Sequence, residues 1–345
     1  MKLLIITQVV DTEDPVLGFF HQWIRELAKR FDHVEVICLK LGKSDLPQNV
    51  GITSLGKTES SKQKAVSSRI RYTLRFLRLI WGMRNQYEAV FVHMNQEYVI
   101  LGGWLWRLLG KNVYMWRNHY AGSWLTDAAS YFCTKIFCTS TRSYTAKYKE
   151  TVLMPVGVDT ERFSLDVRVA RQPRSILFLS RIAPSKRPEM LVDALASLHD
   201  EVTFTASFVG SPLPQDEAYY ESLKEKVRSL GLGQQVSFSL GVPNSQTPDL
   251  YRAHEIFVNT SPSGMLDKTI FEAAASGCVV LAASADFAMI AGADSHFDSS
   301  AELAALLKKQ LTSAMSAPDT AKLVEQNSLA LLGRRLAEEM GSESC

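Results

Sequence analysis

Short apolar runs alternate with stretches of helical periodicity along the first half of the chain. The apolar runs are "KLLIITQVV", "VEVICLK", "AVFVHM", "NVYMWRN" and "KIFCTS", and each has the length of a buried strand. Between them, "FFHQWIRELAKRF", residues 69–83 and "ILGGWLWRLLG" place apolar side chains at the spacing of one helical face. This alternation predicts parallel βαβ units, with helices over both faces of the sheet.

The pattern starts again after the polar and basic passage "VLMPVGVDTERFSLDVRVARQPR", which we interpret as a linker. It continues with "SILFLS", a helix from Pro188, "VTFTASFVG", a helix around "YYESLKEKVRSLG", "QVSFSLG", "EIFVNT" and "CVVLAA". We predict an α/β fold of two doubly wound, Rossmann-like domains, residues 1–160 and 161–320, that face a central cleft with the ligand at the carboxyl ends of the strands. A last amphipathic helix, within residues 321–345, is expected to pack back toward the N-terminal domain.

Composition and charge narrow the class of protein. The chain has 345 residues, of which 46% are apolar and 21% charged, as in a globular enzyme of two domains. Its 38 Lys and Arg against 36 Asp and Glu leave a formal net charge of +2, so no nucleic-acid partner is expected. The five cysteines have neither disulfide nor zinc spacing, which predicts reduced thiols, no metal and a cytoplasmic location. We interpret the first apolar run as a strand and not as a leader, and no run is long enough to span a bilayer.

A dinucleotide-dependent dehydrogenase is the obvious rival for two such domains. The first strand is followed by "DTEDPVLGFFHQW", which holds one glycine and no G-x-G-x-x-G. The second domain's "LSRIAPSKRP" lacks this fingerprint as well. Both turns therefore argue against a nicotinamide cofactor, and no other cofactor is expected.

Basic residues gather in the turn after "SILFLS". Arg181, Lys186 and Arg187 come directly before Pro188, a residue favoured at the first position of a helix. Three cations at the positive end of a helix, with Glu189 as the nearby acid, predict an anion site that needs no metal. The alternative is a solvated turn whose side chains splay apart.

A second cationic turn lies in "SPSGMLDKTIFEAAASG", residues 261–277. Asp267 suits the N-cap of a short helix, Gly264 lets the loop approach a ligand, and Lys268 shares a helical face with Glu272. A Lys in the first turn opposes the helix dipole, which favours a bound anion over a plain salt bridge to Glu272. Two such turns in one domain predict a nucleoside diphosphate held between them, with Glu272 accepting hydroxyl hydrogen bonds.

Several motifs occur in the order and spacing of a known family. They are "PVGVDTERF", "LSRIAPSKRPEMLVDAL", "FVGSPLP", "YRAHEIFVNTSPSG" and "FEAAASGCVVLAA". With them, the chain resembles the GT-B glycosyltransferases of the large retaining family four, also called group 1. The resemblance implies a GT-B fold and transfer of a sugar, with retention and without metal, from a UDP- or GDP-sugar to a glycan or lipid-linked acceptor in surface polysaccharide or glycolipid synthesis.

The resemblance also implies roles for residues of the second domain. Arg181 and Lys186 match the basic pair that grips the donor diphosphate, and Glu272 matches the second glutamate of the family's Glu, seven residues, Glu motif, which bonds the donor ribose. Donor contacts are further expected from the turn residue Ser180, from Gly210 beside the diphosphate, and from Gly241, Val242 and Pro243 near the base.

One position departs from the family pattern. The first glutamate of the motif, which holds hydroxyls of the transferred sugar, falls at Gly264. Backbone N–H groups around Met265 and Leu266, or Asp267 itself, are candidates to replace that contact, beside Lys268 at the anion. The departure leaves the identity of the sugar open.

Three residues of the first domain are acceptor-side candidates. Gly18 in "DPVLGFFHQW" resembles the glycine of the loop after the first strand, and His119 in "YMWRNHY" stands where the family often has a histidine facing the reacting sugar. His93 in "VFVHMNQE" is a second candidate of this kind. For both histidines the alternative is an ordinary surface or core residue.

A basic stretch runs from Lys62 to Arg84 without an acidic residue. Arg71, Arg75 and Arg78 share one helical face. Leu74, Leu77 and Trp81 follow another, which suits an interfacial helix on an anionic membrane. A core helix with a solvated basic rim fits the pattern equally well. The basic residues are Lys62, Lys64, Arg69, Arg71, Arg75, Arg78 and Arg84.

Two alternatives to a transferase use the same architecture. One is a catalytically inactive module that binds a nucleotide-sugar, suggested by the missing glutamate at Gly264. The other is a nucleotide-sugar epimerase, although no acidic and histidine set is arranged for that reaction. For a transferase, no carboxylate pair is placed for the hydrolase scheme, so front-face attack is our hypothesis, with the leaving phosphate accepting the acceptor's proton.

Overall fold

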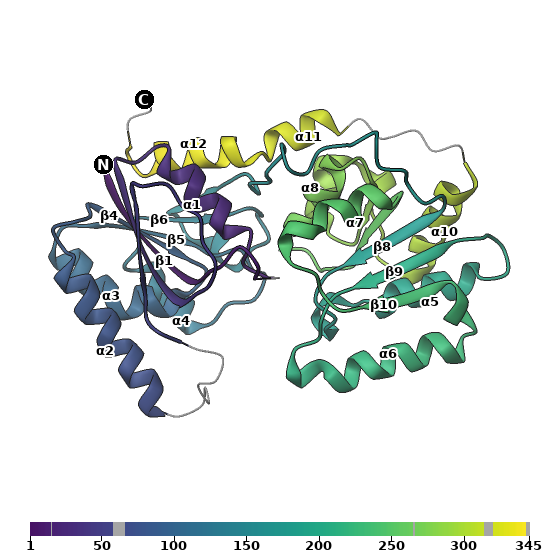
Figure 1. Ribbon diagram of the computed structural model, residues 1–345, viewed down its shortest axis with the longest axis horizontal. Helices are drawn as coiled ribbons and strands as arrows, with labels where there is room; N and C mark the ends of the chain where they lie inside the picture. The colour runs from purple at the N-terminus through teal and green to yellow at the C-terminus, as the bar shows by residue number, and fades with distance from the viewer. Residues whose placement is uncertain (15, 58–65, 265, 314–319, 343–345) are drawn as a thin grey trace. The chain divides into compact units, whose positions relative to one another are not determined.

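The computed structural model describes residues 1–14, 16–57, 66–264, 266–313 and 320–342. It divides into two compact units, each built on its own parallel sheet. Unit 1 comprises Met1–Pro155 and Leu329–Cys345, and unit 2 comprises Val156–Ser328. The predicted alternation of strands and helices is present in both (Figure 1).

Unit 1 contains a seven-stranded sheet in the order β3-β2-β1-β4-β5-β6-β7. Its strands are β1 (Lys2–Val10), β2 (His33–Leu41), β3 (Val50–Ser54), β4 (Ala89–His93), β5 (Asn112–Trp116), β6 (Lys135–Cys138) and β7 (Thr151–Leu153). Its helices are α1 (Phe20–Ala28), α2 (Val66–Gly82), α3 (Gln96–Leu108), α4 (Trp124–Ser130) and α12 (Leu329–Glu339).

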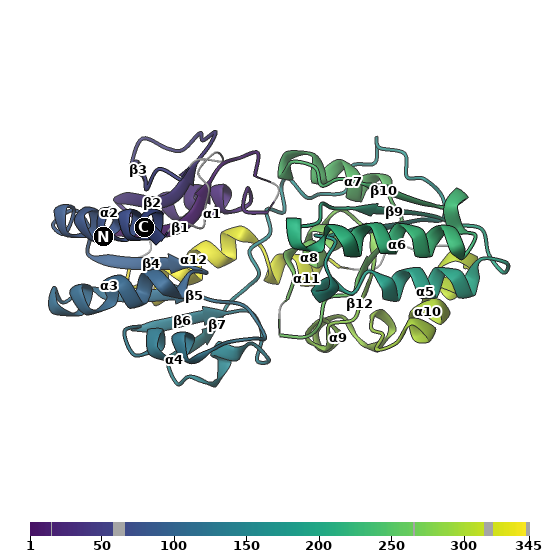
Figure 2. The same cartoon turned by 90° about the horizontal axis from the view of Figure 1, so that it is seen from below.

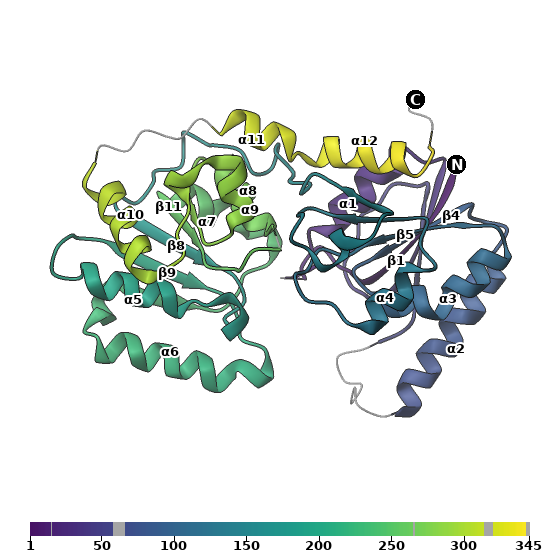
Figure 3. The same ribbon diagram turned by 180° about the vertical axis from the view of Figure 1, so that it is seen from behind.

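Both faces of the unit 1 sheet are covered because successive side chains of a strand point to opposite faces. Leu3 and Ile5 of β1 pack in one core with side chains of α1 and α12. Leu4 and Ile6 pack in another core with α2, α3 and α4. Figure 3 shows α1 and α12 together on one side of this sheet, and Figure 2 shows α2, α3 and α4 over the other.

Unit 2 contains a five-stranded sheet in the order β10-β9-β8-β11-β12. Its strands are β8 (Ser175–Leu179), β9 (Thr205–Val209), β10 (Val236–Ser239), β11 (Ile256–Asn259) and β12 (Val279–Ala282). Its helices are α5 (Glu189–Leu198), α6 (Glu217–Ser229), α7 (Thr247–Ala253), α8 (Lys268–Ala275), α9 (Ala285–Ala291), α10 (Ser300–Thr312) and α11 (Ala321–Gln326).

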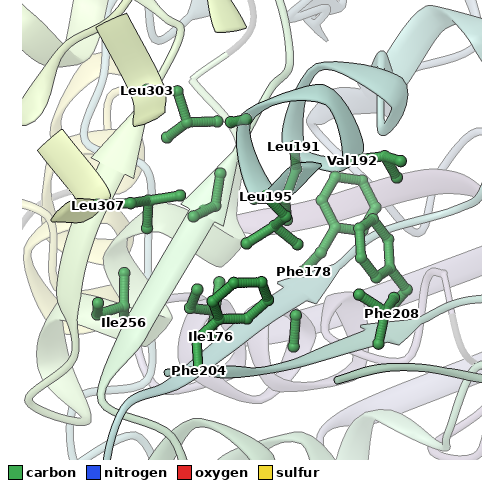
Figure 4. Close-up of a cluster of buried hydrophobic side chains, with 14 of the residues drawn as sticks. Ile176, Phe178, Leu191, Val192, Leu195, Phe204, Phe208, Ile256, Leu303 and Leu307 are labelled. Carbon is green, nitrogen blue, oxygen red and sulfur yellow. The ribbon is translucent and has the colours of Figure 1, made fainter. Parts of the chain in front are cut away.

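The unit 2 sheet is covered in the same way. Phe178 of β8 packs with Phe208 of β9 and with Leu195 of α5 (Figure 4). Leu177, one residue earlier on β8, belongs to the opposite core with Phe271 of α8. These two cores fix the ends of the strands, and with them the loops that follow.

Two expected boundaries differ in the structure. The passage interpreted as a linker lies mostly inside unit 2, where Phe163 is buried and Arg171 donates to the carbonyls of Ser276 and Gly277. The last helical stretch is two helices: α11 packs on α8 in unit 2, and α12 packs on α1 in unit 1. The helix ends before Asn327, whose carbonyl accepts the N–H groups of Gly157 and Val158.

Each sheet has one switch point, where neighbouring strands send the chain to opposite faces. It lies between β1 and β4 in unit 1 and between β8 and β11 in unit 2. In open α/β sheets, ligands bind at the carboxyl ends of the strands beside such a point. Within the described part of the chain, no helix combines the length and apolar character needed to cross a bilayer.

Candidate functional site

Two loops are tied together at the switch point of unit 2. The turn after β8 contains a short 3-10 helix, Pro184–Lys186, and the loop after β11 begins at Thr260. Thr260 Oγ1 donates to the carbonyl of Lys186, and Arg187 Nε donates to the carbonyl of Thr260 at 2.8 Å. The loops that follow β8 and β11 are thus joined by two hydrogen bonds at the carboxyl ends of these strands.

An ion pair also joins these two loops. Lys186 Nζ is 2.7 Å from Asp267 Oδ2 and 3.0 Å from Ser261 Oγ, and the two charged side chains are 12% and 19% exposed. Asn259 Nδ2 and the Ser261 hydroxyl donate to the same carboxylate oxygen. Burial alone would raise the pKa of Asp267, but the Lys186 charge and these hydrogen bonds outweigh burial and lower the pKa. Asp267 therefore carries its negative charge at neutral pH.

Other predicted donor residues follow the carboxyl ends of β8, β9 and β10 in the same sheet. Arg181 is exposed, and no described residue forms an ion pair or hydrogen bond with its side chain. Gly210, after β9, lies so close to the turn that a Cβ would stand 1.8 Å from the Ser180 carbonyl oxygen, so only glycine fits. After β10, the N–H of Gly241 donates to Ser211 Oγ at 3.0 Å. Val242 and Pro243 follow Gly241 directly.

Gly264 holds a backbone position that suits glycine. Its φ is 88°, in the left-handed region, and its N–H donates to Asp286 Oδ2 at 2.6 Å. In return, the N–H of Ala285 donates to Ser263 Oγ at 2.9 Å, so the loop after β11 is fastened to the start of α9. Leu266 is buried, and Met265 lies outside the described residues.

Asp267 occupies the predicted N-cap position of α8, but its predicted capping bond is absent. We expected the carboxylate to accept backbone N–H groups of the helix. It instead faces Lys186, because an ion pair with an ammonium is stronger than a bond to a neutral amide. The correction changes the role of Asp267 from a helix cap to a partner of the candidate anion-binding lysine.

Lys268, the first residue of α8, has an internal acceptor. Its Nζ donates to the carbonyl of Gly157. Glu272, one turn further, is 4% exposed and accepts a hydrogen bond from Tyr251 at 3.1 Å. Burial lowers the pKa of Lys268 and raises that of Glu272, while the attraction between the two charges opposes both shifts. Contact of Lys268 with a ligand anion stays a prediction.

The three candidates of unit 1 lie near its switch point in different surroundings. Gly18 is buried in the loop before α1. His93, the last residue of β4, is 1% exposed and stacks on Phe20 with ring centroids 3.8 Å apart. His119 lies in the loop after β5, half-buried, where its Nδ1 accepts the N–H of Ala121 at 2.9 Å. His93 is therefore a buried residue, and its acceptor-side role stays a prediction.

The family model "Glycosyl transferases group 1" matches residues 159–326. This region contains the Lys186–Asp267 ion pair and the loops that carry it. Residues 159–326, which lie in unit 2, are thus similar to the group 1 glycosyl transferases.

Curated members of this family are similar to the chain over part of their length. The mannosylfructose-phosphate synthase of Agrobacterium fabrum is 32% identical over 147 residues, which cover 39% of this chain and 32% of that protein. The GDP-mannose-dependent alpha-(1-6)-phosphatidylinositol monomannoside mannosyltransferase of Mycolicibacterium smegmatis is 30% identical over 145 residues, which cover 37% of each chain. The match thus spans about a third of each relative, 32% and 37% of their lengths.

Solved structures of glycosyltransferases share the fold of the whole chain. The Anabaena HepE structure in complex with UDP and glucose has a TM-score of 0.78 at 19% identity, over 99% of this chain and 100% of that one. WaaG, a glycosyltransferase involved in lipopolysaccharide biosynthesis, has a TM-score of 0.68 at 15% identity, over 99% of this chain and 100% of that one. These matches confirm the predicted GT-B fold.

Five polar residues in or near these loops escaped the sequence analysis. All but Arg162 stand next to a strand or helix end, and that position was their one signal in the sequence. Arg162 donates to Asn244 and carries a guanidinium whose pKa burial lowers, and Arg117 follows β5 with its Nε buried and without a partner among the described residues. The set is Arg117, Arg162, Asn259, Ser261 and Asp286.

The basic stretch forms α2, whose two faces differ in exposure. Phe76 and Ile80 are fully buried in the core of unit 1. Ile70, Leu74 and Trp81 are 54%, 62% and 50% exposed on the outer face. Lys62 and Lys64 lie outside the described residues, and Arg69, Arg71, Arg75 and Arg78 lie on the helix, with Arg84 just after it.

Proposed function

We propose that the chain is a retaining glycosyltransferase that moves a sugar from a UDP- or GDP-sugar to a glycan or lipid-linked acceptor. The observation that carries the proposal is the largely buried Lys186 at the switch point of unit 2, inside the region that matches the family. The names of the relatives support the donor class, since one is GDP-mannose-dependent and the HepE structure holds UDP and glucose. Surface polysaccharide or glycolipid synthesis is the proposed setting.

The proposed mechanism rests on charge at the leaving group. In transfer, negative charge grows on the diphosphate as the bond to the sugar breaks. Lys186 and Arg181 stand ready to stabilise it, which is preorganised electrostatic catalysis. Asp267 is engaged by Lys186, and Glu272 is buried against Tyr251, so neither is placed as a nucleophile. This supports front-face attack, in which the leaving phosphate accepts the acceptor's proton. In this mechanism Glu272 bonds the donor ribose, and His119 lies near the reacting sugar.

A donor screen tests the proposal. The purified chain is incubated with UDP-, GDP- and ADP-sugars, with and without membrane-extracted glycolipid acceptors, and released nucleotide is measured. One donor class is expected to support transfer, with the anomeric configuration retained when the product is examined by NMR. Binding without turnover on every donor would favour the inactive module, and interconversion of the donor sugar without acceptor would favour the epimerase.

We further propose that α2 contacts an anionic membrane surface, which would place the protein at the inner face of the cytoplasmic membrane. Trp81 and Leu74 are exposed among arginines, and the neighbouring α3 exposes Trp104 and Leu108 by 54% and 76%. Aromatic and aliphatic side chains between cations suit the interface of such a membrane. The relatives' names support a lipid acceptor, since one acts on a phosphatidylinositol monomannoside.

Flotation with phosphatidylglycerol vesicles tests this surface. The wild type is expected to float at low salt, and the double variant Leu74→Ala/Trp81→Ala is expected to float at least about fivefold less. Leu240→Ala in unit 2, where the side chain is 64% exposed, is the matched control. Absence of wild-type binding at low salt would reject the membrane contact and leave α2 as a core helix with a solvated rim.

A further inference from the structure

One carboxylate of the candidate donor site has an oxygen that is available to a ligand. Lys186, Ser261 and Asn259 all donate to Asp267 Oδ2. Among the residues that the structure describes, no donor bonds Oδ1, and Oδ1 is not among the buried atoms. A carboxylate with one oxygen saturated and the other open is held in place and can still accept a hydroxyl hydrogen bond.

The neighbouring carboxylates are more deeply buried. Glu272 is 4% exposed and accepts the hydrogen bond of Tyr251. Asp286 is 2% exposed and accepts the N–H of Gly264, which itself brings no side chain to the loop. Asp267 is therefore the most exposed of these three carboxylates, and its three donors fix its position.

Lys186 is also only partly used by its internal partners. An ammonium carries three protons, and among the described residues Lys186 donates to two groups, Ser261 and Asp267. One N–H is left for a phosphate oxygen. The carboxylate at 2.7 Å offsets much of the positive charge, so Lys186 attracts a bare diphosphate less than an unpaired lysine would.

We propose that Asp267 is the specificity-determining residue of the donor site. Its Oδ1 accepts a hydrogen bond from a hydroxyl of the transferred sugar, and its charge weakens the binding of a nucleoside diphosphate that carries no sugar. An intact donor offers a hydroxyl to the carboxylate, whereas the product diphosphate meets it uncompensated and is released. The inference rests on the proposed glycosyltransferase function.

Asp267→Asn tests the proposal, because the amide keeps the shape and removes the charge. Dissociation constants of the wild type and the variant are measured by calorimetry for UDP, GDP and ADP, and for the donor found in the screen. The variant is expected to bind its nucleoside diphosphate about tenfold more tightly and to lose at least about tenfold in kcat/KM for the donor. The preference for intact donor over diphosphate then shifts by about a hundredfold, which is about 2.8 kcal/mol at about 1.4 kcal/mol per tenfold.

Deoxy analogues of the donor separate recognition from mere loop support. For the wild type, a donor that lacks the hydroxyl bonded by Asp267 is expected to have a kcat/KM at least about tenfold lower than the intact donor. For Asp267→Asn, the same deoxy donor is expected to lower kcat/KM less than about threefold. Asp249→Asn on α7, where the side chain is 80% exposed, is the charge-matched control and changes neither quantity. Asp267→Ser repeats the measurement if the Asn variant does not fold.

The outcomes distinguish the two proposals. If Asp267→Asn weakens diphosphate and donor alike, or changes neither, Asp267 only supports the loop and this inference is overturned. If every monodeoxy donor loses equally in wild type and variant, it is overturned as well. If the wild type binds no nucleoside diphosphate and no nucleotide-sugar, the proposed function itself fails, whatever the variant does.

Discussion

The switch points of the two sheets have the same topology and opposite chemistry. At the end of β4 in unit 1, His93 is 1% exposed and stacked on Phe20. At the end of β11 in unit 2, polar residues lead to the Lys186–Asp267 ion pair, whose side chains are 12% and 19% exposed. A parallel sheet therefore offers a binding position in both units, and the side chains decide which one is charged. Four predictions test this difference.

The largest expected effect is on catalysis at the unit 2 switch point. Lys186→Ala removes the cation placed to stabilise the leaving diphosphate, and turnover is expected to fall about 10²–10³-fold. Transfer is measured with the donor found in the screen. Lys226→Ala, which removes a lysine of α6 paired with Asp193, is the control and keeps wild-type turnover. If Lys186→Ala transfers sugar at nearly the wild-type rate, the two switch points do not differ in function and the proposed mechanism is wrong.

The next effect is on stability at the unit 1 switch point. His93→Ala removes a large buried ring, and the free energy of unfolding is expected to fall by about 2–4 kcal/mol. Urea denaturation followed by tryptophan fluorescence measures it. His119→Ala, at a half-buried loop position, should cost less than about 1 kcal/mol. A His93 variant with wild-type stability and abolished transfer would instead identify a reacting histidine.

A smaller effect concerns the pH dependence of the Lys186–Asp267 pair. The pKa of Asp267 is lowered from its usual 3.8, so its contribution to stability is present above pH 3.8 and lost as the pH falls through the lower folded value. At neutral pH, the free energy of unfolding of the wild type is expected to exceed that of Asp267→Asn by about 1–3 kcal/mol. Urea unfolding between pH 7 and the acid limit should show this difference shrinking below pH 3.8. A difference that stays constant into acid would contradict an ionised, paired Asp267.

The smallest effect concerns the buried acid behind the site. Tyr251→Phe removes one hydrogen bond to Glu272, formed at 3.1 Å, and is expected to cost about 1 kcal/mol of unfolding free energy. Because Glu272 then loses a donor to its charged form, its pKa, already raised by burial, should rise further. Unfolding in urea at neutral pH checks the first expectation. Phe163→Leu, in the same core, controls for general loosening of packing.

Local sequence patterns predicted the strands and helices, but they did not predict the boundary between the two units. "SILFLS" predicted β8, and the helix expected from Pro188 is α5, because both signals lie within a few residues. The passage before β8 looked like a linker because it has few apolar residues. Its anchors are Phe163 in the core and Arg171 on carbonyls over a hundred residues away in sequence, and no local pattern announces such contacts.

By itself, the sequence determined the two α/β units, their parallel sheets and the gathering of cations in the turn after β8. Alternating apolar runs and a proline before a helix act through near neighbours, so they can be interpreted without coordinates. Only the tertiary structure decided that Asp267 faces Lys186 rather than its own helix, and that His93 is a core residue. Both facts depend on which strands become neighbours in the sheet, because that choice brings charges and rings together across long stretches of chain.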